Sequence, residues 1–103
     1  MLQPLDGPAA QTTLSANTTV VQEIKVGGSP LSARKVITVQ PTSGRVYVYF
    51  GDDTASAPSA GTVSSNGSVV FKNAKETFEA GEKQPVYVLA VSGTVSVKIV
   101  ERA

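Results

Sequence analysis

The chain has 103 residues, a formal net charge of +1 and 17% charged residues. This length suits one domain, and a near-neutral charge without a basic block argues against nucleic-acid binding. Cysteine and histidine are absent, which excludes disulfides, thiolate chemistry and the side chain most often used as general base or metal ligand.

Residues 1–10, MLQPLDGPAA, predict an extended N-terminal arm that precedes a folded domain over residues 11–103. Its apolar side chains suit packing against a neighbouring subunit, although a frayed terminus is the alternative. The arm residues that we expect to contact a partner are Met1, Leu2, Pro4 and Leu5. The start lacks the basic and then apolar order of a secretion signal, and no apolar stretch approaches the roughly 20 residues of a membrane span. We therefore expect the chain to fold in the cytoplasm of the cell that makes it and to have no membrane partner.

Two imperfect alternations predict the first strands. Residues 18–26, TTVVQEIKV, indicate a half-buried strand with Val20, Ile24 and Val26 on one face, which Gln22 interrupts. Residues 34–40, RKVITVQ, predict the next strand, and Pro41 should stop it because proline donates no ladder hydrogen bond.

Residues 45–50, RVYVYF, predict a strand with bulky side chains on both faces. The valines and the phenylalanine point one way, whereas Tyr47 and Tyr49 point the other. Such a strand is expected to be central or covered on both sides.

A long polar loop is expected over residues 51–62, GDDTASAPSAGT. Asn66 and Gly67 then predict a type I′ hairpin turn, which needs two residues with positive φ. Short strands should follow at residues 68–72 and 76–80.

The last two strands are expected over residues 86–91 and 94–101, joined by Ser92 and Gly93 in a tight antiparallel hairpin. The inward positions of the final strand should be Val95, Val97 and Ile99. With about seven or eight short strands separated by turn residues, the chain predicts an all-β fold. It should be a single antiparallel β-sandwich or a jelly-roll-like barrel, because no helical crossovers are available for a parallel sheet.

The strand that ends in GDD resembles, over three letters, the metal-binding hairpin of viral RNA polymerases. A polymerase needs a far longer chain and further carboxylates, so Asp52 and Asp53 are better explained as a strand end and loop start. A weak calcium site in this loop is the chemical alternative. We expect no catalytic residue, no cofactor and no resident metal, and hence no enzyme.

Three tyrosines are candidate partner-binding residues, namely Tyr47, Tyr49 and Tyr87. Aromatic rings on a sheet face stack on sugars or anchor protein interfaces. The simpler interpretation is a second core layer with the hydroxyl groups at its rim.

The second half of the chain, residues 45–101, is similar in its order of elements to small virion proteins of tailed bacteriophages. The segments that carry this resemblance are VYVYFGD, SSNGSVVF, FEAGE and VYVLAVSGTVSVKIVE. Many members of this group are β-sandwich or jelly-roll proteins that serve as capsid decoration, or cement, proteins. The resemblance implies binding to the major capsid protein and to other copies of the chain as a trimer or dimer, at the capsid surface of the virion.

The alternative function is a phage tail, fibre or host-attachment module that binds carbohydrate. It requires exposed, coplanar tyrosine rings. A small enzyme is a third class, which the missing histidine and cysteine disfavour.

Overall fold

A computed structural model describes residues 9–52 and 56–103 of the chain. Eight strands and one short helix lie in these ranges. The strands are β1 (Ala9–Ala16), β2 (Gln22–Glu23), β3 (Val36–Pro41), β4 (Val46–Phe50), β5 (Ser68–Val70), β6 (Glu76–Glu79), β7 (Val86–Ala90) and β8 (Val95–Arg102). The helix is α1 (Ala60–Asn66).

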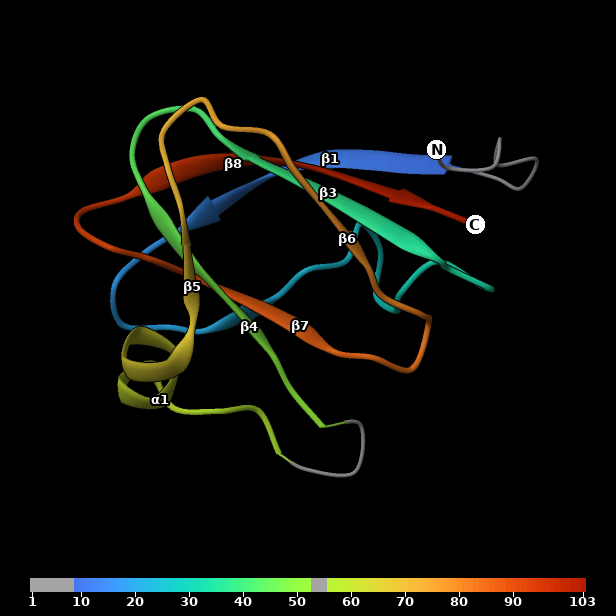
Figure 1. The fold of residues 1–103 in the computed structure, drawn as a ribbon, viewed down its shortest axis with the longest axis horizontal. Helices are drawn as coiled ribbons and strands as arrows, with labels where there is room; N and C mark the ends of the chain where they lie inside the picture. The colour runs from blue at the N-terminus through green and yellow to red at the C-terminus, as the bar shows by residue number, and fades with distance from the viewer. Residues whose placement is uncertain (1–8, 53–55) are drawn as a thin grey trace.

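The strands form two antiparallel sheets that pack face to face (Figure 1). Sheet A has the order β1-β8-β3-β6, and sheet B has the order β2-β7-β4-β5. The fold is therefore an all-β sandwich, as the composition and turn spacing predict. The start of β1 and the end of β8 lie at the same end of the sandwich, because Ala9 pairs with Arg102.

The core lies between the two sheets and follows from period-two burial. Strand β8 shows it most clearly, because alternate residues from Val95 to Glu101 are buried while Ser96 and Lys98 are exposed. The predicted inward positions of this strand are thus confirmed. Valine and isoleucine dominate the core, and their branched side chains fit a pleated surface well.

Strand β7 is buried on both faces, since each of its five residues is buried. One face belongs to the core, and the other lies under α1, which contacts both β7 and β4. Val63 of α1 and Leu89 of β7 are 0% and 2% exposed but lie outside the main core cluster. A second, smaller apolar layer therefore covers the outside of sheet B.

The expected hairpin between the last two strands is wrong. Strand β7 belongs to sheet B and β8 to sheet A, so the chain crosses between the sheets there. Gly93 has a φ of +62° in this connection. The turn residues were recognised correctly, but a turn signal alone does not say whether the next strand pairs with its neighbour or faces it.

The type I′ turn predicted at Asn66 and Gly67 is also wrong. Asn66 is the last residue of α1, and Gly67 caps the helix with an extended backbone of φ −75°. Glycine is needed here for space, because a Cβ atom at position 67 would lie 2.6 Å from the Val63 carbonyl oxygen. The helix begins at its cap Ser59, whose Oγ accepts a hydrogen bond from the Thr62 amide.

The helix also corrects the expected polar loop over residues 51–62, whose last residues form the first part of α1. The strand expected over residues 18–26 shrinks to β2, and Val20 is 57% exposed rather than buried. Pro41 is the final residue of β3 and does not lie beyond it.

Strand β1 was not predicted. Ala9 and Ala10, which the sequence assigned to the arm, are its first residues. Residues 1–8 of the expected arm, including Met1, Leu2, Pro4 and Leu5, lie outside the described residues. Within the described ranges, no helix is long and apolar enough to cross a membrane.

Candidate interaction surface

The three tyrosines lie on the outer face of sheet B. Tyr49 of β4 stands directly opposite Tyr87 of β7, and Tyr47 stands opposite Leu89. Tyr47 and Tyr49 are half-buried, and Tyr87 is 7% exposed. The structure thus brings these side chains together, but it buries Tyr87 and half-buries Tyr47 and Tyr49 instead of presenting a free aromatic platform.

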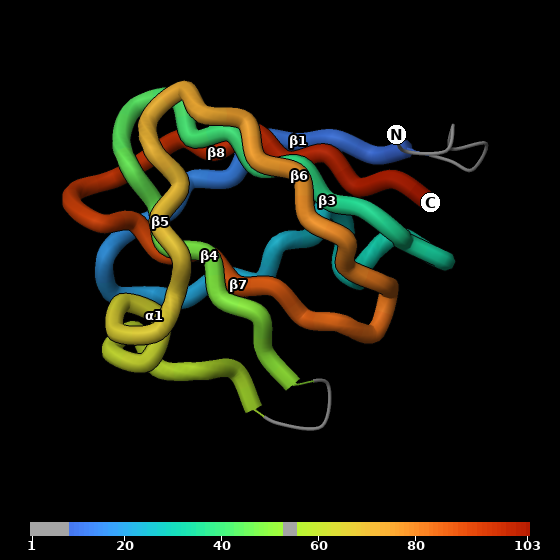
Figure 2. The backbone as a smooth tube through the Cα atoms, viewed as in Figure 1, coloured from blue at the N-terminus to red at the C-terminus, as the bar shows by residue number. Residues whose placement is uncertain are grey.

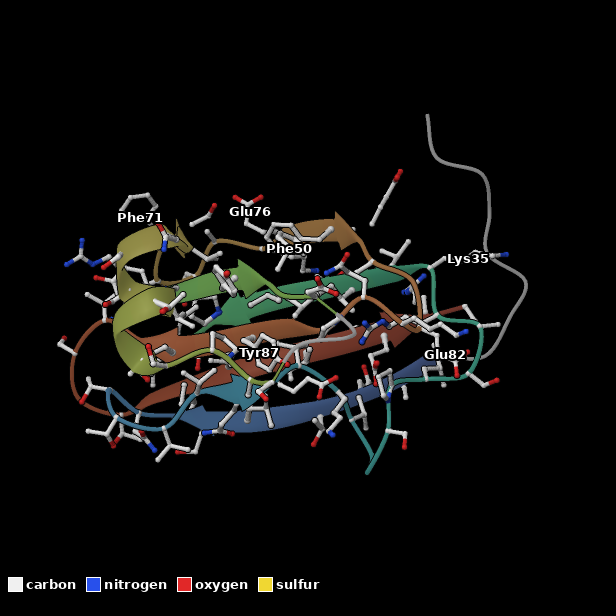
Figure 3. The ribbon with its side chains drawn as sticks, turned by 90° about the horizontal axis from the view of Figure 1, so that it is seen from below. Lys35, Phe50, Phe71, Glu76, Glu82 and Tyr87 are labelled. Carbon is white, nitrogen blue, oxygen red and sulfur yellow. The ribbon has the colours of Figure 1, made fainter. Side chains whose placement is uncertain are left out.

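Tyr87, labelled near the centre of the view in Figure 3, packs closely against the end of β4. A Cβ atom at Gly51 would lie 2.6 Å from its ring, so glycine at position 51 is what lets the ring lie against the end of β4. Loss of solvent raises the pKa of the Tyr87 hydroxyl above its usual value, and the negative charge of Glu23 raises it further. Folding therefore favours the protonated phenol, whose ring acts as part of the packing.

Gly51 and Asp52, the described part of the GDD segment, line a shallow, open depression of about 510 Å³ together with Lys83 and Gln84. Gln84 Nε2 donates a hydrogen bond of 2.6 Å to the Gly51 carbonyl oxygen and so ties the two loops together. Asp52 is exposed, and Asp53 lies outside the described residues. Within the described part of the chain, no three carboxylate side chains gather as a metal site.

Exposed apolar side chains concentrate on another part of the molecule. Among the described residues, the large hydrophobic side chains that remain exposed are Val20, Phe50, Val69 and Phe71. The last three lie on or directly after β4 and β5. Phe71 and Phe50 both project along one margin of the sandwich, with Glu76 between them in the same view (Figure 3).

We call this margin the β5–β6 side and define it by Phe50, Val69, Phe71 and Phe78. Phe50 is the last residue of β4 and contacts Phe78 of β6, with ring centroids 5.4 Å apart in an edge-to-face arrangement. Phe78 is partly buried against the core, whereas Phe50 is 42% exposed. The side is thus anchored in the core and open to solvent at once.

Charged residues lie near these apolar side chains in the sequence. Lys72 and Lys75 come one and four residues after Phe71, and Glu76 and Glu79 lie on either side of Phe78 in β6. All four are exposed. An apolar centre with a charged and polar rim is the usual anatomy of a protein–protein interface.

Sequence reasoning missed the β5–β6 side. The run of three apolar residues at 69–71 carried the signal, because in a strand it must place Val70 on one face and its neighbours on the other. Val70 is buried, and Val69 and Phe71 are exposed at 40% and 60%.

The other notable group is a buried ion pair that sequence reasoning also missed. Arg34 is 2% exposed and Glu101 is 1% exposed, and their Nη1 and Oε2 atoms are 2.9 Å apart. Arg34 precedes β3 and Glu101 lies on β8, so the pair joins segments that are far apart in the sequence.

Every N–H group of the Arg34 guanidinium finds a partner. Besides Glu101, it donates to four backbone carbonyl oxygens at 2.7–3.2 Å. These belong to Ile24, Ala80, Gly81 and Gln84. Glu101 in turn accepts from the amides of Val26 and Leu31 at 2.7 and 3.1 Å. The charges are thus buried but fully bonded, which is the condition for tolerating them in a core.

The consequence is that one arginine fixes the two loops at this end of the sandwich. The loop between β2 and β3 and the loop between β6 and β7 run beside each other here (Figure 2). We call Arg34 and Glu101 the buried ion pair. It is enclosed, so its role is to hold the loops.

No protein-family model matches this chain, and no curated protein is recognisably similar to it. The functional argument therefore depends on the residues and their geometry.

Proposed function

We propose that this chain is a structural protein of tailed-bacteriophage virions that decorates the capsid by binding the lattice of the major capsid protein. The observation that carries the proposal is the β5–β6 side, where Phe50, Val69 and Phe71 are each exposed on or directly after the paired strands β4 and β5. Exposed apolar groups of this kind mark binding surfaces on otherwise polar proteins. The order of strand and turn segments over residues 45–101 supports the same class.

The fold suits that task. A decoration protein must keep its shape while many copies pack on a shell, and a sandwich with a branched-residue core is rigid. The net charge of +1 limits repulsion between copies. The proposal places the protein at the capsid surface and carries the prediction that it catalyses no reaction.

Co-sedimentation with purified heads of the phage that encodes the chain tests the proposal. Wild-type protein should sediment with the heads and give added density on the capsid by electron microscopy. Phe71→Ser should weaken head binding at least about tenfold, because it removes a large exposed apolar contact. Val20→Ser is the matched control, because Val20 is 57% exposed but lies outside the β5–β6 side.

Two results would count against the proposal. One is wild-type protein that stays in the supernatant with heads at saturating concentration. The other is equal loss of binding in both variants, since that would remove the special role of the β5–β6 side. A variant that lacks residues 1–8 tests the predicted arm separately, because β1 starts at Ala9 and remains intact.

Carbohydrate binding is the alternative to capsid decoration, and the same purified protein can be used to test it. Such binding requires exposed tyrosine rings, but Tyr87 is 7% exposed and Tyr47 and Tyr49 are half-buried. A glycan array should therefore give no hit that depends on Tyr47 or Tyr49. A reproducible glycan hit lost on mutation of either residue would favour a host-attachment role.

A further inference from the structure

The four outer edges of the two sheets differ sharply in how they are protected. Strand β2 has two residues, β5 has three, and β6 has four, of which Glu76 and Glu79 are charged. Strand β1 has eight residues, AAQTTLSA, with no charge, proline or glycine. Short length, charge and proline are the usual means by which edge strands avoid pairing with other chains. Only β1 lacks all three.

The hydrogen bonds of β8 show which backbone groups of β1 point outwards. The Ser96 carbonyl accepts from the Thr42 amide and the Arg102 carbonyl accepts from the Lys35 amide, so the backbone groups of both residues point towards β3. Ser96 and Arg102 stand opposite Ser15 and Ala9 of β1. Ser15 and Ala9 therefore form no backbone hydrogen bonds with these two residues of β8. Along a strand of an antiparallel sheet, the N–H and C=O groups of successive residues point alternately to one neighbouring strand and to the other.

The backbone groups of Ala9, Gln11, Thr13 and Ser15 therefore point away from β8. One of them is already engaged, because Gln22 Nε2 donates a 2.6 Å hydrogen bond to the Ser15 carbonyl. Among the described residues, no strand pairs with this outer edge of β1. The free part of the edge thus contains Ala9, Gln11 and Thr13.

We propose that two copies of the chain pair through the outer edges of β1, antiparallel across a twofold axis at Gln11. A twofold axis perpendicular to a sheet keeps each residue on its own face, so the central residue must stand opposite itself. With Gln11 at the centre, Ala9 of each copy stands opposite Thr13 of the other. This register joins all free outward groups in about six hydrogen bonds and stops short of Ser15.

A second copy is the occupant that the edges favour. Of the four edges of this sandwich, only β1 is long and uncharged, so β1 is its own best complement. No charged side chain of either β1 would face another, and the net charge of +1 adds little repulsion. Sheet A of one copy would thus continue into sheet A of the other, which gives one sheet of eight strands. This inference stands on the sheet edges and does not depend on the capsid role.

Light scattering coupled to size-exclusion chromatography tests the pairing with the full chain. Wild-type protein should have twice the 10.6 kDa chain mass at about 100 μM. Gln11→Pro removes only an outward N–H group and should raise the dimer Kd at least about tenfold. Gln11→Ala, which keeps that N–H, is the matched control and should remain dimeric.

Gln11→Lys gives an independent variant if the proline disturbs β1. It places two lysines opposite each other at the axis, so it should be monomeric at low salt and dimeric at about 1 M salt. Circular dichroism should show that each variant retains strand structure.

Amide hydrogen exchange identifies the register directly. On dilution from dimer to monomer, the amides of Ala9, Gln11 and Thr13 should lose protection, whereas Thr12 and Leu14 should keep theirs through β8. A wild-type monomer at 100 μM, or a dimer unaffected by Gln11→Pro and Gln11→Lys, would overturn the proposal. So would a wild-type monomer whose Gln11→Pro variant loses head binding, because β1 would then pair with a capsid strand.

Discussion

The buried ion pair and the β5–β6 side lie in different parts of one small sandwich and treat their side chains in opposite ways. Arg34 and Glu101 are charged, yet they are enclosed and every guanidinium N–H is bonded. Phe50 and Phe71 are apolar, yet they are 42% and 60% exposed. From residue type alone, the charged pair would be expected at the surface and the two phenylalanines in the core.

The difference separates groups that maintain the fold from groups available to a partner. A buried charge persists only where its loss would leave other polar groups unpaired, so the ion pair reports on the structure of the loops. An exposed phenylalanine gains little from the fold, so it is free to contribute to binding. Mutations in the two regions should therefore affect different measurements.

The largest expected effect follows from Glu101→Gln. It removes the negative charge and leaves the Arg34 guanidinium buried without a counter-ion. The free energy of unfolding should fall by about 3–5 kcal/mol, a large part of the total for a domain of this size. Urea unfolding followed by circular dichroism measures it, and a loss below about 1 kcal/mol would mean that the pair behaves as a surface salt bridge.

Arg34→Lys sharpens the same point with a smaller effect. Lysine keeps the charge but has three donors in place of five, so it cannot serve all four carbonyl oxygens and Glu101. A loss of about 2–3 kcal/mol is expected, less than for Arg34→Met, which removes the charge as well. If Arg34→Lys and Arg34→Met lose the same unfolding free energy, the positive charge adds nothing to stability and the hydrogen-bond geometry accounts for the whole effect.

On the β5–β6 side, the Phe50–Phe78 contact should have a modest energy. A double-mutant cycle with Phe50→Ala and Phe78→Ala should give a coupling of about 0.5–1.5 kcal/mol, the range for edge-to-face pairs. Phe71→Ser should change stability by less than about 0.5 kcal/mol while weakening head binding. A large destabilisation by Phe71→Ser would contradict the separation of the two regions.

The smallest effect concerns Tyr87, which lies in neither region. Its pKa is raised in the folded chain, so the protonated phenol is favoured by folding. The associated stability is present below the unfolded pKa of about 10 and is lost as pH rises through the higher folded value. Unfolding curves from pH 8 to 11 should therefore show a steeper loss for wild type than for Tyr87→Phe, and parallel curves would refute this.

The sandwich could be predicted because its signals are local. Alternation in β3, β4 and β8 reports burial directly, and the inward valines and isoleucines lie where the period places them. Strand β1 was not predicted because its residues are small or polar, and Leu14 is the one large apolar side chain that could indicate a buried face. Its strand character comes from pairing with β8, which lies at the other end of the sequence.

The functional surfaces were harder for the same reason. The tyrosines were recognised as a group, but the helix that packs against β4 and β7 was hidden because AGTVSSN carries only one apolar anchor, Val63. The ion pair joins positions 67 residues apart, and no local pattern marks two such partners. The β5–β6 side depends on which strands become edges, a property of topology and not of any single segment.

The place of β8 in sheet A affects how the chain matures during synthesis. Strands β1 and β3 do not touch through hydrogen bonds, because β8 lies between them and pairs with both. On the ribosome, the first of these strands must wait unpaired until residues 95–102 have emerged. Assembly of this layer is therefore dominated by distant contacts and correspondingly slow, and β1 remains open and uncharged until β8 is available to pair with it.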